Sequence, residues 1–163
     1  MPYSRTQVLL HWFSAVIILW ATFTGFYVAF ADVSASVKHT IGSINVSLTT
    51  VLVPFFALRL GLAIIGRGRH AAGEPMARIA HWAIYAATTV VLATGVLMME
   101  RDIDVFHLLV IPAPLSDAAI TADFNRAHKY ACMVLAGLVV LHVAAVIKHH
   151  LAGNPVLGRM RWR

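Results

Sequence analysis

Residues 127–150 read AHKYACMVLAGLVVLHVAAVIKHH, an apolar segment that contains two histidines, His128 and His142, fourteen positions apart. Each residue turns an α-helix by about 100°, so fourteen residues fall about 40° short of four full turns and both imidazoles leave nearly the same face. The rise between them is roughly 21 Å. Since the hydrocarbon core of a bilayer is about 30 Å thick, a spanning helix would hold one histidine near each membrane surface.

The composition is typical of an integral membrane protein. The chain has 163 residues, of which 60% are hydrophobic and 12% charged, whereas soluble domains average about 25% charged residues. Apolar windows close to or above the roughly 20 residues needed to cross a bilayer predict four transmembrane helices. Their expected ranges are about 6–31, 38–65, 75–99 and 123–151, with Asp123 as the N-cap of the last. We therefore expect an all-α integral membrane four-helix bundle that forms a single domain over residues 1–163.

The distribution of charge predicts the orientation in the membrane. If the N-terminus is cytoplasmic, nine of the 13 Lys and Arg residues lie on the inner side, as the positive-inside rule requires. Both termini are then cytoplasmic. The net charge of +6 does not indicate nucleic-acid binding, because the basic residues sit at the ends of apolar spans and form no stripe on a soluble face. The first apolar run is too long for a cleaved secretory signal, so we expect a retained first helix.

The connections between helices carry local signals. The inner loop 66–74 reads GRGRHAAGE, whose glycines break the helix and whose arginines suit the anionic inner leaflet, and the tail 153–163 is expected at the same surface. Pro54 should kink the second helix. The outer loop 100–122 contains the apolar run VFHLLVI at 105–111. We expect this run to lie in the membrane interface and cover the outer end of the bundle.

Of the nine histidines, His70 and His107 lie in loops and His149 and His150 at the inner interface, and the other five lie within the predicted spans at two depths. The outer level holds His39 and His128, and the inner level holds His11, His81 and His142. A lone histidine at such a position is commonly an interfacial or packing residue, but ionisable groups within spans are functional candidates. Neutral imidazole is a good axial ligand of haem iron, and two per iron leave no open position, which suits electron transfer. The matched levels predict two haem b groups, one at each level.

Other residue types support or limit this interpretation. Cys132 is the only cysteine, which excludes an internal disulfide, a c-type haem attachment and a cysteine-ligated iron–sulfur cluster. The pattern H-W-x12-G occurs twice, from His11 to Gly25 and from His81 to Gly95. A glycine one level beyond a histidine could let a macrocycle approach the backbone. Gly42 and Gly137, beside and between candidate ligands, could do the same.

Several basic residues lie near the candidate ligands. Lys38, Arg126 and Lys129 flank the outer histidines, where they could contact haem propionates, attract a small anion, or simply anchor the helices at the interface. Arg59 lies near the inner end of the second helix, where it could extend to the interface or meet an acidic group.

Short motifs along almost the whole chain resemble the bacterial cytochrome b561 family, four-helix di-haem b membrane proteins that include superoxide:quinone oxidoreductases. The matching motifs are LHW at 10–12, KHTIG at 38–42, LRL at 58–60, AHWAIY at 80–85, ATGVLMM at 93–99, LHVAAVIKHH at 141–150, the H-x13-H that joins His128 to His142, and LGRM at 157–160.

The resemblance implies a pairing that spacing alone left open. It pairs His11 with His142 at the inner haem and His39 with His128 at the outer haem. His81 then lies near a propionate or the quinone without binding iron, although it stays the rival inner ligand. Both sets of partners follow from the family pattern, not from the depth of the histidines.

The resemblance also implies a location and a reaction. The protein would lie in the bacterial inner membrane, surrounded by lipid, and pass electrons between an outer-face donor and a ubiquinone-type quinone bound in the inner half, near His81. The donor stays open between superoxide, a soluble periplasmic partner and a reductase subunit. The chain would then be an oxidoreductase, either a superoxide oxidase or a quinone-linked electron carrier, with no catalytic residue assigned.

Two functions of other classes compete with this prediction. One is a non-enzymatic membrane protein, such as a histidine-lined metal or proton carrier, and the other is an anchoring subunit that recruits a soluble redox partner. Transporters usually place carboxylates near a midplane site. No Asp or Glu falls in the middle of any predicted span, which argues against a cation carrier.

Overall fold

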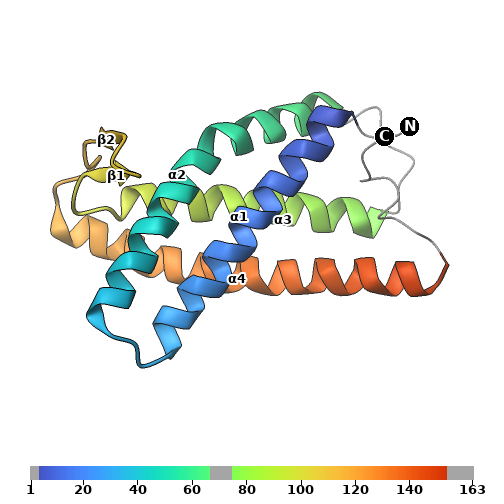
Figure 1. The fold of residues 1–163 in the computed structure, drawn as a ribbon. Helices are drawn as coiled ribbons and strands as arrows, with labels where there is room; N and C mark the ends of the chain where they lie inside the picture. Colours follow the sequence, from blue (N-terminus) through green and yellow to red (C-terminus); the bar gives the residue numbers. More distant parts are fainter. Residues whose placement is uncertain (1–3, 67–74, 154–163) are drawn as a thin grey trace.

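A computed structural model describes residues 4–66 and 75–153. Its four long helices are α1 (Arg5–Phe30), α2 (Ala35–Ile65), α3 (Pro75–Leu97) and α4 (Ala118–Leu151) (Figure 1). Each is long and apolar enough to cross a membrane, which confirms the four predicted spans and the all-α membrane bundle. The expectations for most of the inner loop and for the tail concern 67–74 and 154–163, which lie outside the described residues.

Serine side chains begin the first two helices. At α1 the Ser4 hydroxyl accepts from the Gln7 backbone N–H, while the Gln7 side chain accepts from the Ser4 N–H. This reciprocal capping box satisfies two donors that a helix start leaves free. At α2 the Ser34 hydroxyl accepts from the Val37 N–H, so α2 begins at Ala35, three residues before the predicted start at 38.

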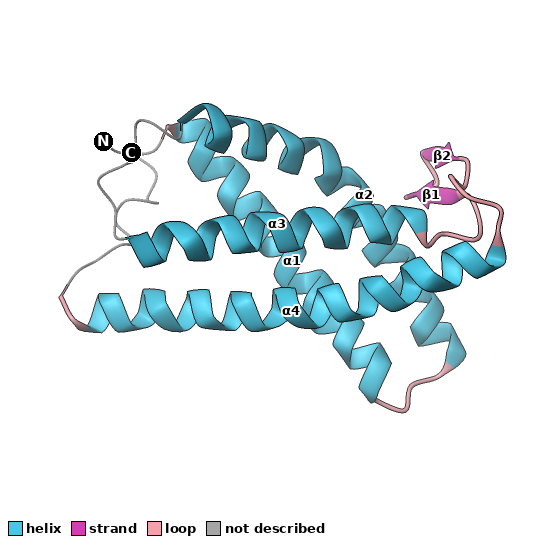
Figure 2. Ribbon diagram, turned by 180° about the vertical axis from the view of Figure 1, so that it is seen from behind, coloured by secondary structure: helices cyan, strands magenta, loops and turns pink. Residues whose placement is uncertain are grey.

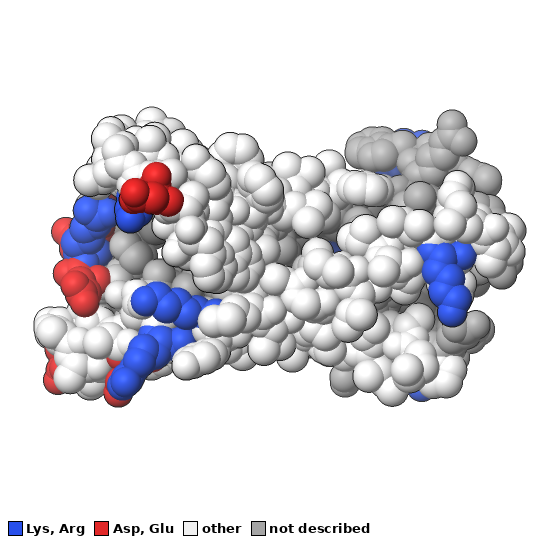
Figure 3. Space-filling view, turned by 90° about the horizontal axis from the view of Figure 1, so that it is seen from below, with Lys and Arg blue, Asp and Glu red and all other residues white. Residues whose placement is uncertain are grey.

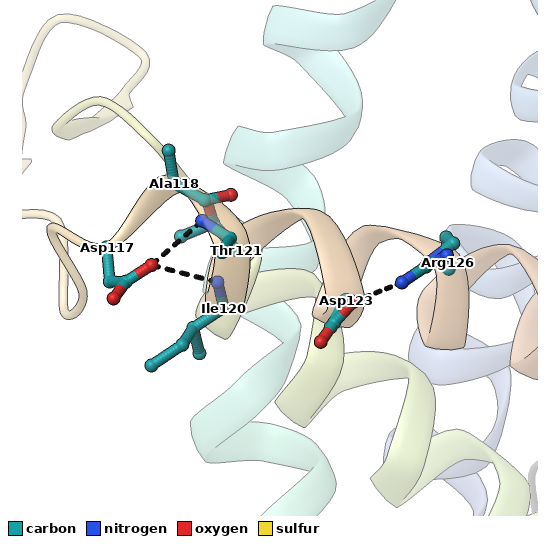
Figure 4. Close-up of polar contacts among 7 residues, drawn as sticks. Asp117, Ala118, Ile120, Thr121, Asp123 and Arg126 are labelled. Atoms are coloured by element: carbon teal, nitrogen blue, oxygen red, sulfur yellow. Dashed lines mark hydrogen bonds and ion pairs between the residues drawn. The ribbon is translucent and has the colours of Figure 1, made fainter.

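The prediction that Asp123 caps the last helix is wrong. The cap is Asp117, whose carboxylate accepts from the backbone N–H groups of Ala119 and Ile120 (Figure 4). Asp123 lies inside α4 and pairs with the guanidinium of Arg126 one turn later (Figure 4). The first turn of α4 therefore forms from residues that hydropathy alone assigned to the outer loop.

The helices form two antiparallel pairs. The most extensive contacts join α1 to α2 and α3 to α4, and the two pairs cross obliquely (Figures 1 and 2). Ile17 of α1 packs with Leu52 and Phe56 of α2, and Tyr85 and Leu92 of α3 pack against this cluster. These apolar contacts hold α3, and α4 behind it, against the first pair.

The second helix continues through its proline. Pro54 lies inside α2, and Figure 1 shows the helix changing direction along its length. Proline lacks the N–H that would bond to the preceding turn, so such a helix bends at or near it. The bend tilts the inner half of α2, which carries Arg59.

Charged side chains gather at the two ends of the molecule and leave an uncharged band between them (Figure 3). In the described part of the chain, every Asp and Glu lies at the end formed by the outer loop and the α1–α2 turn. Large apolar side chains such as Phe23, which is 75% exposed, face outward along the helices. This is the surface expected of helices in lipid.

The outer loop folds into a small hairpin that sequence analysis did not predict. Strand β1 (Ile103–Val105) pairs antiparallel with β2 (Leu109–Ile111). Ile103 and Val105 are buried, and the hydroxyl of Ser47 in α2 donates to the Asp104 carbonyl and accepts from the Phe106 N–H. The hairpin is thus fixed to α2 at the outer end of the bundle, and its location in the membrane interface stays a prediction.

Candidate functional site

His128 lies at the outer level, with its ring turned from α4 toward α3. Its Nδ1 is 3.1 Å from the carbonyl oxygen of Val91 and 3.1 Å from the hydroxyl oxygen of Thr94. A carbonyl can only accept, so Nδ1 must carry the ring proton. The lone pair is then on Nε2, the protonation pattern that a neutral histidine needs in order to bind a metal through Nε2.

Gly95 of α3 makes room for that ring. A Cβ at Gly95 would lie 3.2 Å from Cε1 of His128 and 3.5 Å from its Nδ1, so a larger residue would displace the imidazole. The sequence spacing suggested room for a macrocycle at this glycine, and the contact observed there is with the outer histidine. Gly25, the corresponding glycine of α1, has no such neighbour within 4 Å.

Three helices bring histidines together at the inner level. The rings of His81 on α3 and His142 on α4 have centroids 5.4 Å apart, with planes inclined by 59°. His11 of α1 is close enough to both to interact with them electrostatically. The structure therefore gathers all three inner-level candidates in one cluster, which we call the inner histidine cluster.

Arg59 belongs to this cluster, a role that sequence analysis did not assign. Its Nη2 is 2.9 Å from Nδ1 of His11, and its guanidinium carbon is 5.1 Å from the centroid of the Tyr85 ring. It also interacts electrostatically with His81 and His142. The signal that could have found it is an arginine within an apolar span, because such residues usually meet a partner in the protein.

The outer candidates are less closely assembled. His39 is exposed near the start of α2, and among the described residues no hydrogen bond or ring contact joins it to His128. Pairing of these two histidines therefore stays a prediction of the family resemblance. The same holds for His11 with His142, since the ring that lies beside His142 is His81.

The three outer basic candidates differ in their environment. Lys38 and Lys129 are exposed near the outer ends of α2 and α4. Arg126 is exposed as well, but its guanidinium is paired with Asp123 on the same helix (Figure 4). Lys38 and Lys129 are thus better placed than Arg126 to meet an anion.

A buried hydroxyl marks the region between the two levels. Thr88 is 1% exposed, and its hydroxyl has no hydrogen-bond partner in the described part of the chain. On the same helix Thr89 and Thr94 donate to carbonyls four residues earlier. Thr88 lies seven residues from both His81 and Gly95, so it shares their face, and an unmet hydroxyl there costs about 1–3 kcal/mol.

These side chains fit haem groups held by axial histidines. His128 keeps its lone pair on Nε2, where the thiol of Cys132 lies 3.4 Å away. The inner histidine cluster offers imidazoles from facing helices, and Thr88 offers an unmet donor between the levels. Across residues 4–66 and 75–153, no three His, Cys, Asp or Glu side chains are grouped so as to hold a metal ion directly.

Comparison with known proteins agrees with this chemistry. The family model described as "Prokaryotic cytochrome b561" matches residues 2–163. "Cytochrome b561 homolog 2" of Escherichia coli (strain K12) is 27% identical over 158 residues, which cover 91% of this chain and 84% of that protein. The match thus includes all four helices and both histidine levels.

Proposed function

Because this chain belongs to the prokaryotic cytochrome b561 family, and is therefore a multi-pass b-type cytochrome of the inner membrane, we propose that it holds two haem b groups. It passes electrons one at a time between a donor at the outer face and a ubiquinone-type quinone. The observation that carries this proposal is the pair of histidines on α4. His128 has its proton on Nδ1 and its lone pair on Nε2, which only the weakly donating thiol of Cys132 contacts, at 3.4 Å, among the described residues, and His142 lies beside a histidine of a facing helix.

The proposed ligands are His39 and His128 at the outer level and His11 and His142 at the inner level. Held by these histidines, the haems would supply one-electron redox chemistry. The chain supplies the orientation of the ligands: Val91 and Thr94 fix the ring of His128. The apolar band of the helices keeps water from the sites.

The donor site is proposed at the outer face, where superoxide is one candidate. The described outer residues comprise six carboxylates and four basic side chains, so the outer face as a whole does not attract anions. An anion such as superoxide would have to be attracted locally, by Lys38 and Lys129, and this attraction would weaken as salt is added. A soluble partner protein and a reductase subunit are the other candidate donors at this face.

The quinone site is proposed in the inner half of the membrane. A groove on the lipid-facing surface of α1 and α2 is lined by Leu9, Trp12, Phe13, Val16, Ile17 and Leu48. It lies next to His11, whose ring meets Trp12 edge-on with centroids 5.4 Å apart. An apolar groove that is open to lipid suits a lipophilic quinone, and the inner histidine cluster would lie within reach of its head group.

Replacement of the α4 histidines tests the proposal. His128→Ala and His142→Ala should each remove about half of the b-type absorbance in dithionite-reduced minus oxidised spectra, because each removes one axial ligand of one haem. His150→Ala, an exposed histidine at the inner end of the same helix, is the matched control and should retain both haems. If neither His128→Ala nor His142→Ala loses haem, the ligand assignment is wrong.

A second pair of variants tests the inner partner. His11→Ala should lose the same haem as His142→Ala, whereas His81→Ala should retain it, if the family pairing applies. The reverse result would make His81 the ligand, as its closeness to His142 allows. Turnover of the purified protein with superoxide and quinone, or with quinol, then identifies the donor and the direction of electron flow.

A further inference from the structure

Arg59 is a cation placed among the inner histidines by a helix that contributes no ligand there. Its guanidinium contacts His11 at 2.9 Å and lies over the ring of Tyr85. The described acidic residues are all at the outer end of the bundle, so the described chain gives this half-buried cation no carboxylate. A guanidinium in a membrane span is costly unless it meets an anion or strong acceptors.

The contact with His11 cannot persist when His11 is a neutral iron ligand. Guanidinium groups donate hydrogen bonds and have no acceptor, so Nδ1 of His11 must accept from Arg59. A neutral imidazole that binds iron through Nε2 carries its proton on Nδ1, which then donates. The contact in the structure and neutral ligation by His11 are therefore mutually exclusive.

We propose that Arg59 is the anchor for a propionate of the inner haem, and that its guanidinium exchanges Nδ1 of His11 for a propionate carboxylate when His11 takes the iron. The inference rests on the proposed function, because it requires an inner haem held by His11. Haem itself brings the anion that the inner end of the described chain lacks. Arginine suits this role, since its planar fork matches a carboxylate through two parallel hydrogen bonds.

The exchange couples haem binding to the position of His11. While Arg59 holds Nδ1, the proton of the imidazole is on Nε2 and the iron-binding lone pair is blocked. Release of Nδ1 allows the tautomer that binds iron. The outer site needs no such change of tautomer, because Val91 and Thr94 already hold the proton of His128 on Nδ1, and only the Cys132 thiol contacts its Nε2 in the described part of the chain.

Substitution of Arg59 tests the anchor, with Arg78 as the matched control because it is an exposed arginine in the first turn of α3 at the same end. The inner haem is identified as the component lost in His142→Ala. In Arg59→Gln its affinity should fall about tenfold or more, since a charge-assisted bond is lost. Its midpoint potential should fall by about 60 mV, the one-electron equivalent of a factor of ten, because a nearby cation favours the reduced haem.

Three comparisons keep the result specific. Arg59→Lys, which retains the charge, should recover most of the inner potential and haem content. Arg78→Gln should match the wild type, and the outer component should be unchanged in every variant. Haem content and potential are read without any turnover assay, so they do not depend on the identity of the donor.

Reconstitution with haem dimethyl ester, which lacks the propionate charges, locates the partner of Arg59. Wild-type protein should bind the ester at the inner site as weakly as Arg59→Gln binds ordinary haem, and the ester should cause no further loss in Arg59→Gln. If the ester instead lowered the inner haem affinity of Arg59→Gln further, Arg59 would act on a group other than a propionate. That result would overturn the propionate assignment.

Other outcomes also contradict the inference. Arg59→Gln with two haems at wild-type affinities and potentials would eliminate the anchor. A rise in the inner potential would show that Arg59 stays on His11 and holds it as an anionic imidazolate ligand. Wild-type protein with a single b-type component would contradict the proposed function itself, a result distinct from failure of Arg59 alone.

Discussion

At the scale of single residues, the partner of Nδ1 separates the two levels. His128 donates from Nδ1 to a carbonyl and a hydroxyl of α3, whereas His11 accepts at Nδ1 from Arg59. The outer imidazole therefore already has the tautomer that binds iron, and only the Cys132 thiol, 3.4 Å from its Nε2, must move aside. The inner one must first exchange its Nδ1 partner. The depth of each histidine could be predicted from the sequence. Its hydrogen-bond partner could not, because Val91 and Arg59 come from other helices.

Thr94→Val tests the support of the outer ligand. The change keeps the side-chain volume but removes one of the two acceptors of the Nδ1 proton, while the Val91 carbonyl remains. Groups that orient a metal ligand usually contribute about 10- to 100-fold in affinity, so with one acceptor left we expect a loss of up to about tenfold. A less basic imidazole should also raise the potential of the outer haem, as read by redox titration.

Thr89→Val is the control for this change. Thr89 is an exposed threonine of α3 that donates to a carbonyl four residues earlier, as Thr94 also does, but it does not contact His128. The control should keep wild-type haem content and potentials. Equal behaviour of the two variants would mean that Thr94 does not support His128.

At the scale of elements, the four helices could be predicted from the sequence because each is a long apolar run. The β1–β2 hairpin could not be predicted. Its turn places Phe106 and His107 at φ of 53° and 58°, a left-handed conformation for which Asn-Gly is the usual sequence signal. The Asp104 carboxylate holds His107 through its N–H and Nδ1, and Ser47 lies 57 positions away from Asp104. The start of α4 could not be predicted to the residue, because an Asp stands at both 117 and 123 and either could cap a helix.

Ser47→Ala tests how the hairpin is held to α2. The variant leaves the Asp104 carbonyl and the Phe106 N–H without the Ser47 hydroxyl, at a cost of about 1–3 kcal/mol. Amide hydrogen exchange of residues 103–111 should become about tenfold faster or more, measured by mass spectrometry in detergent. Ser43→Ala, one turn earlier in α2, makes no hydrogen bond to the hairpin and should leave exchange unchanged. Equal exchange in both variants would remove Ser47 as the attachment point.

At the scale of the whole molecule, the two crossed helix pairs decide which histidines can share a haem. Hydropathy indicates how deep a residue lies in the membrane but not which way its side chain points around the helix axis. It could therefore assign each histidine to the inner or outer level, but it could not show which two histidines face each other. The structure supplies part of that direction by placing His81 against His142 and Arg59 against His11. The outer pair of His39 and His128 still depends on the family pattern.

The number of haems per chain tests the central claim most directly. Pyridine haemochrome absorbance divided by the polypeptide concentration of the purified, haem-replete protein should give two b haems per chain, and a redox titration should resolve two one-electron components. Both follow from two levels of paired imidazoles on one α4 helix. A ratio of one haem per chain, or a colourless protein, would contradict a di-haem cytochrome built on His128 and His142.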